Sequence, residues 1–133
     1  MPAELLHLSG DGETYVTAEV VRRGMRVRFS PGATVRHFTS ASRMTLNYLR
    51  ERSFKQGVIK TYTIIRKLQG FNPRVVIILT MIIIKSLVIG FLASNPGIRA
   101  MRFGYIKGIV WHLQHCGSIP DTIEWILKDK YIK

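Results

Sequence analysis

Cysteine and acidic side chains are scarce in this sequence of 133 residues, and each scarcity excludes something. Cys116 is the single cysteine, so the chain cannot form an internal disulfide, which fits a reducing compartment. Eight Asp and Glu stand against twenty Lys and Arg, for a formal net charge of +12. This surplus predicts an acidic partner: nucleic acid, anionic lipid or a phosphate-bearing substrate. The first residues lack a basic stretch followed by an apolar run, so we expect no signal peptide.

One long apolar run, residues 75–94, interrupts this basic sequence. Twenty helical residues cover about 30 Å, which is the thickness of the bilayer hydrocarbon core. Lys85 lies within the run and costs about 2.5–3.5 kcal/mol on insertion. Thirteen Ile, Leu, Val and Phe residues return about 4–8 kcal/mol, at about 0.3–0.6 each. The run therefore predicts a transmembrane helix over residues 73–95; the alternative is a pair of buried strands in a soluble core.

The N-terminal part predicts short mixed elements. Residues 11–24 have the pattern of a helix with Asp11 as N-cap and Gly24 as the C-terminal stop. Residues 25–29 alternate apolar and basic side chains, as a half-buried strand does. A turn over residues 30–32 and a second extended segment over residues 33–37 follow.

Helical spacing dominates the rest of the chain. Residues 42–67 form a basic helix that ends before Asn72 and Pro73. Residues 99–114 are amphipathic, so they form either a helix in the membrane interface with Trp111 as anchor, or a helix packed on another domain. A last helix begins near residues 118–121.

Three segments together resemble the end of the catalytic domain in family-2 glycosyltransferases. In that family an acidic pair opens a helix ending at Arg-Arg-Gly, and two strands around a Pro-containing turn end in His. A helix with Arg, an aromatic residue and Gln-Gly follows, and then membrane helices. The matching residues here are Asp11, Glu13, Arg22, Arg23, Gly24, Pro31, His37, Arg52, Phe54, Gln56 and Gly57.

The resemblance implies an α/β fragment, the edge of a GT-A-like catalytic domain, within a chain that is mostly helical overall. Residues 1–72 would be the end of the catalytic domain, residues 73–95 the transmembrane helix, and residues 96–133 amphipathic interfacial helices. The family carries its nucleotide-binding strands and an Asp-x-Asp metal motif in an earlier half, and no Asp-x-Asp occurs in this chain. We therefore expect this chain to be inactive alone.

The resemblance also assigns chemical roles. An inverting sugar transfer needs a base for the acceptor hydroxyl, and the family places it at the acidic pair, here Asp11 or Glu13. Arg52 and Gln56 lie four residues apart on one helical face, where they would contact a diphosphate or an acceptor sugar. His37 matches a position that in some relatives helps bind a divalent metal, Mg or Mn, whose other ligands would lie in the absent half.

The implied partners are a nucleotide-sugar donor, a glycan or lipid-linked acceptor, membrane lipids and a separately encoded catalytic half. The alternative function is a small basic single-span membrane protein that binds anionic lipid or another membrane protein and catalyses nothing. Nucleic acid is not expected, because the basic residues are interleaved with few stacking aromatics and a membrane span is present.

The basic residues near the apolar run predict its orientation in the cell membrane. Five precede it and three follow: Lys55, Lys60, Arg66, Lys67 and Arg74 against Arg99, Arg102 and Lys107. Because positive charge favours the cytoplasmic side, we expect the N-terminal part to be cytoplasmic.

Overall fold

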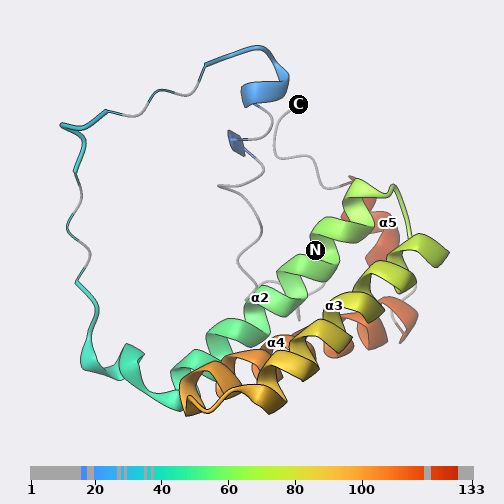
Figure 1. Ribbon diagram of the computed structural model, residues 1–133. Coiled ribbons are helices and arrows are strands. Elements are labelled where there is room, and N and C mark those ends of the chain that lie inside the picture. The colour runs from blue at the N-terminus through green and yellow to red at the C-terminus, as the bar shows by residue number, and fades with distance from the viewer. Residues whose placement is uncertain are drawn as a thin grey trace.

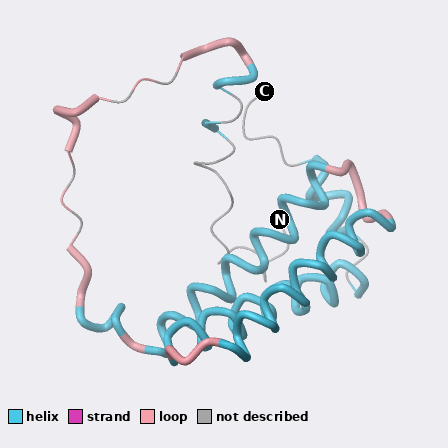
Figure 2. Tube along the Cα trace, in the orientation of Figure 1, coloured by secondary structure: helices cyan, strands magenta, loops and turns pink. Residues whose placement is uncertain are grey.

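The computed structural model describes residues 16–17, 20–26, 28, 30–34, 36, 38–118 and 121–128. A 3₁₀ turn, η2 (Ala41–Met44), leads into α2 (Leu46–Lys67). Three more helices follow: α3 (Pro73–Leu92), α4 (Pro96–Ser118) and α5 (Asp121–Lys128). Helices α2, α3 and α4 lie side by side, with α5 near the end of α2 (Figure 1). The helical colour of Figure 2 covers nearly all of the chain after residue 40, apart from short connections.

Local sequence signals set the helix ends. The Thr45 hydroxyl accepts a hydrogen bond from the Tyr48 backbone N–H and caps α2. The Asn72 side chain accepts from the backbone N–H groups of Arg74 and Val75, with Pro73 in the first turn of α3. Asn95 accepts from the Gly97 and Ile98 N–H groups at the start of α4. Each cap satisfies donors that have no partner inside the helix.

The connection after α2 reverses the chain through left-handed backbone. Gln69 (φ 54°) and Gly70 (φ 138°) have positive φ. The Gly70 N–H donates to the Ile65 carbonyl and the Gln69 N–H to the Arg66 carbonyl, which is the Schellman pattern of a helix end. The chain can therefore turn back at once, and α3 runs antiparallel to α2.

Glycines allow α2 and α4 to touch along their backbones. A Cβ atom at Gly104 would collide with the Arg50 carbonyl oxygen, and one at Gly108 with the Phe54 carbonyl oxygen. A Cβ atom at Gly57 would likewise collide with the Tyr105 carbonyl oxygen. Because the pairs advance together along both chains, α2 and α4 run parallel. Small residues four apart are a common device for such close helix pairs.

The core lies where the three long helices and α5 meet. Ile65 of α2, Leu79 of α3, Ile109 of α4 and Ile126 of α5 are at most 1% exposed and belong to one cluster. Burial of these side chains joins helices whose outer faces are basic or apolar. The bundle is thus held by one small core and by the α2–α4 contact.

The expected α/β character is wrong for the part of the chain that the structure describes, which contains helices and no strand. Within the two expected strands, the described residues 25–26, 28, 33–34 and 36 are loop. A strand needs a neighbouring strand to pair with and a core to cover its apolar face. Neither is found for this segment among the residues that the structure describes, and Met25 is 52% exposed. The alternation of apolar and basic residues distinguished two faces of this segment. It did not show that a second strand would pair with it.

The expected stop at Gly24 has the geometry of a helix end. Residues 16–17 and 20–22 are helical. Gly24 has φ 75°, its N–H donates to the Val21 carbonyl, and the Met25 N–H donates to the Val20 carbonyl. This is a second Schellman pattern, and it favours glycine because an L side chain resists that φ.

Candidate functional site

Helix α3 presents an apolar face that the bundle leaves uncovered. Among the residues that the structure describes, it is the one helix long and apolar enough to cross a membrane. Only 22% of its most apolar window is buried inside the bundle. The large exposed side chains of this face are Val76, Ile77, Ile78, Met81, Ile84, Val88, Phe91 and Leu92. A continuous exposed apolar surface of this kind indicates contact with lipid or with a partner.

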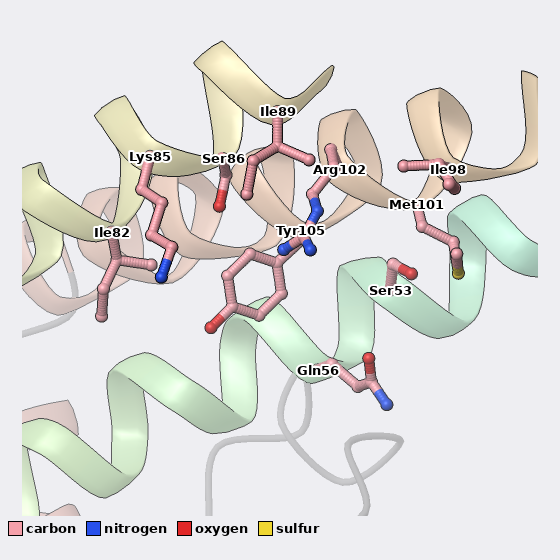
Figure 3. Close-up of a pocket in the computed structure, with 10 residues that line it drawn as sticks. All are labelled: Ser53, Gln56, Ile82, Lys85, Ser86, Ile89, Ile98, Met101, Arg102 and Tyr105. Atoms are coloured by element: carbon pink, nitrogen blue, oxygen red, sulfur yellow. The ribbon is translucent and has the colours of Figure 1, made fainter. Parts of the chain in front are cut away.

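A cavity of about 540 Å³ opens between α2, α3 and α4 (Figure 3). It lies beside the end of α3, where the Arg99 guanidinium donates to the Ala93 carbonyl and ties the α3–α4 connection to α4. Its lining residues are Ser53, Gln56, Ile82, Lys85, Ser86, Ile89, Ile98, Met101, Arg102 and Tyr105.

The described residues that line the cavity carry positive charge and include no acidic side chain. Figure 3 shows the nitrogen atoms of Lys85 and Arg102 reaching from α3 and α4 toward the Tyr105 ring. Burial raises the pKa of Tyr105, and the Arg102 charge partly opposes that shift. The Tyr105 hydroxyl therefore keeps its proton at neutral pH and is available as a donor. The arrangement suits an anion with several acceptor oxygens.

The structure describes two of the five site residues that the sequence indicated. Arg52 and Gln56 are both exposed on α2. Gln56 lines the cavity and Arg52 does not, and in Figure 3 the Gln56 amide points away from Lys85 and Arg102. Asp11, Glu13 and His37 lie outside the described residues.

Lys85 and Arg102 are the residues that sequence reasoning did not select for a site. In the sequence, Lys85 indicates a cost of membrane insertion, and Arg102 is one of the three basic residues that follow the apolar run. A lysine inside an apolar run is itself a signal, because ionisable groups at such depth usually face a cavity and serve a function. The position of Arg102 on the same cavity as Lys85 follows only from the packing of α4 on α3.

A second polar cluster lies on α4, away from the cavity. His112 is 1% exposed, and its Nδ1 lies 3.6 Å from the Cys116 Sγ. Burial, with a smaller contribution from His115, lowers the pKa of His112 to about 4, and burial raises the pKa of Cys116 to about 11. The thiol is therefore protonated and unreactive at neutral pH. The residues that the structure describes contain no group of three or more His, Cys, Asp or Glu side chains suited to hold a metal.

Comparison of the chain with protein-family models, with curated proteins and with solved structures gave no match in any of the three.

Proposed function

We propose that this chain is the membrane-anchoring C-terminal part of an inverting glycosyltransferase that uses a nucleotide-sugar donor. One observation carries the proposal: the ordered pattern from Asp11 to Gly57 precedes an apolar helix of membrane-spanning length, which begins at Pro73. Each piece alone is common, whereas the three in this order are typical of family-2 enzymes. The catalytic half with the Asp-x-Asp motif would be supplied by a separate chain or by upstream sequence.

Arg52 and Gln56 lie on α2, which ends at Lys67, six residues before α3 begins at Pro73. The two exposed side chains are accessible to a second half docking on that face.

The proposed chemistry has separate roles for the named residues. Asp11 or Glu13 would accept the proton of the acceptor hydroxyl as the anomeric carbon is attacked and the nucleoside diphosphate leaves. Arg52 would bind the diphosphate or the acceptor through charge-assisted hydrogen bonds, with Gln56 beside it. His37 would help hold the divalent metal on the diphosphate.

The test joins this chain to a catalytic half carrying the nucleotide site and measures sugar transfer. Asp11→Ala or Glu13→Ala, whichever removes the base, lowers turnover by roughly a hundredfold or more. Donor binding changes little, because the base contacts the acceptor. Arg52→Ala weakens substrate binding instead, and Lys55→Ala, an exposed control on α2, leaves both unchanged. Full activity of the Asp11→Ala, Glu13→Ala and double variants would reject the assigned chemistry.

A second candidate function is attachment of the chain to anionic membranes without catalysis. It is favoured by the exposed apolar face of α3 beside two helices with exposed basic residues, including Lys55, Lys60 and Lys107. Basic residues near an anionic leaflet contribute about 1 kcal/mol each to association. Transfer activity of the joined protein decides between the two candidates.

A further inference from the structure

We propose that the cavity between α2, α3 and α4 is a specific site for the phosphate group of an anionic phospholipid, bound by Lys85 and Arg102. The inference rests on the apolar face of α3 lying in lipid and does not depend on sugar transfer. It goes beyond general attraction to a charged surface, because it assigns the binding to two side chains that line one open cavity.

The charges of the cavity select the ligand. Two cations from different helices face the same space, and none of the described residues that line it is a carboxylate. Neither Lys85 nor Arg102 forms an ion pair with a side chain in the part of the chain that the structure describes. A phosphate offers oxygens for the Arg102 fork and for the Lys85 ammonium at the same time.

The apolar part of the lining selects a lipid rather than a small polar anion. Ile82 and Ile89 of α3 and Ile98 and Met101 of α4 form the walls beside the charges. These residues continue toward the exposed apolar face of α3, including Ile78 and Leu92. A molecule with a phosphate at one end and acyl chains at the other matches both surfaces, whereas a free phosphate matches only the cations.

The experiment measures binding of short-chain phospholipids to the full chain in nonionic detergent, by isothermal titration calorimetry. Dihexanoyl phosphatidic acid, dihexanoyl phosphatidylcholine and inorganic phosphate are titrated separately. The expected result is saturable binding of one phosphatidic acid per chain, with the other two at least roughly tenfold weaker. Inorganic phosphate binding as tightly as the lipid would overturn the lipid assignment, and equal binding of both lipids would overturn the role of charge.

Matched variants separate the site from overall charge. Lys85→Gln and Arg102→Gln each remove one cation from the cavity and weaken phosphatidic acid binding by roughly tenfold or more. Arg74→Gln on α3 and Lys107→Gln on α4 remove the same charge from exposed positions outside the cavity and leave the affinity nearly unchanged. Equal losses from all four variants would show attraction to the whole basic surface and overturn the proposal.

A further variant and a measurement of helical content test whether a loss of affinity comes from a loss of structure. Lys85→Arg keeps the charge and restores most of the affinity, and circular dichroism of every variant reports the helical content. Reduced affinity in a variant with unchanged helicity supports the site, and unchanged affinity in Lys85→Gln overturns it. Because no nucleotide sugar or catalytic half is present, failure here leaves the transferase proposal standing, and failure of transfer leaves this site standing.

Discussion

Three glycines determine how closely α2 and α4 approach. The backbone carbonyls of Arg50, Phe54 and Tyr105 occupy the places where side chains would begin at Gly104, Gly108 and Gly57. Close contact brings many atom pairs into van der Waals range, and each contributes about 0.1–0.2 kcal/mol. It also positions Arg102 and Tyr105, which precede and follow Gly104, toward the cavity. The glycines therefore support both the bundle and the candidate site.

Gly108→Ala is expected to destabilise the bundle, because the new methyl group collides with the Phe54 carbonyl and the helices must separate. Overpacking of this kind costs about 1–3 kcal/mol. Gly117→Ala, on the same helix with nothing within 4 Å, is the control and gains up to about 1 kcal/mol of helix propensity. Thermal unfolding followed by circular dichroism distinguishes the two. Equal midpoints would show that the close contact is unimportant.

His112 is expected to make stability depend on pH. Its pKa is lowered from 6.5 to about 4 in the folded chain, so the unfolded chain binds more protons between these values. The contribution of neutral His112 to the free energy of unfolding is complete above about pH 6.5. It is lost as pH falls through about 4. At about 1.36 kcal/mol per pH unit it amounts to roughly 3 kcal/mol.

The measurement is denaturant unfolding of the chain and of His112→Leu between pH 4 and 7. The variant lacks the titrating group, so its free energy of unfolding should change less across this range. His115, on the same helix, is retained in both proteins and provides the internal control. Parallel curves for the two proteins would assign the pH dependence to other groups.

At the scale of elements, α3 differs from its neighbours. It is buried on the side of Val75, Leu79 and Ser86, and apolar and exposed on the opposite side. Helices α2 and α4 expose basic side chains, among them Lys60 and Lys107. Contact of this apolar face with lipid costs little free energy, whereas its exposure to water is unfavourable. The support for membrane association thus comes from one face of one helix.

The chain is expected to sediment with membranes and to resist carbonate and high-salt washing, because α3 holds it through apolar contact. Ile77→Glu with Ile84→Glu places two charges on the exposed face and should release the protein, since each charge at such depth costs about 2–3 kcal/mol. Lys85→Leu removes a charge and should leave it membrane-bound. Release of the original chain by salt alone would show that surface charge is its only attachment.

The whole molecule is a basic helical bundle with one small core. The core joins α2, α3, α4 and α5, and a cationic cavity lies near the α3–α4 connection. A bundle that is positive on its polar surface and apolar along one helix is suited to an anionic membrane surface. The orientation of the chain in that membrane depends on charge flanking α3.

We expect the N-terminal part to be cytoplasmic. Five basic residues precede the apolar run, residues 75–94, within about twenty positions and three follow it, and positive charge is retained on the cytoplasmic side. Reporter fusions at both ends provide the measurement, with opposite signals expected if α3 spans the bilayer. Reversal of Lys55, Lys60 and Arg66 to Glu should weaken the preference. An external N-terminal fusion would contradict the orientation and would separate the proposed catalytic residues from cytoplasmic nucleotide sugars.

Local patterns were sufficient for the helices of this protein. The apolar run located α3 within a few residues, since its composition alone distinguishes it from the basic sequence on either side. Asn72, Pro73 and Gly24 act through their own backbone neighbours, so their effects on nearby helix ends can be inferred without the fold. Hydrophobic spacing likewise placed α4, although Asn95 begins it earlier than the amphipathic stretch suggested.

Contacts between distant residues were decided only by the tertiary structure. The alternation near Met25 could not supply the second strand that a sheet needs, and the α/β expectation failed for that reason. The sequence contained Lys85, Arg102 and Tyr105, but it did not show that α3 and α4 place them around one cavity. The register of α2 on α4 brings them together, and this register depends on carbonyls meeting glycines about fifty residues apart in the chain. Residue spacing along one helix does not predict these contacts, because the contacting atoms belong to another helix.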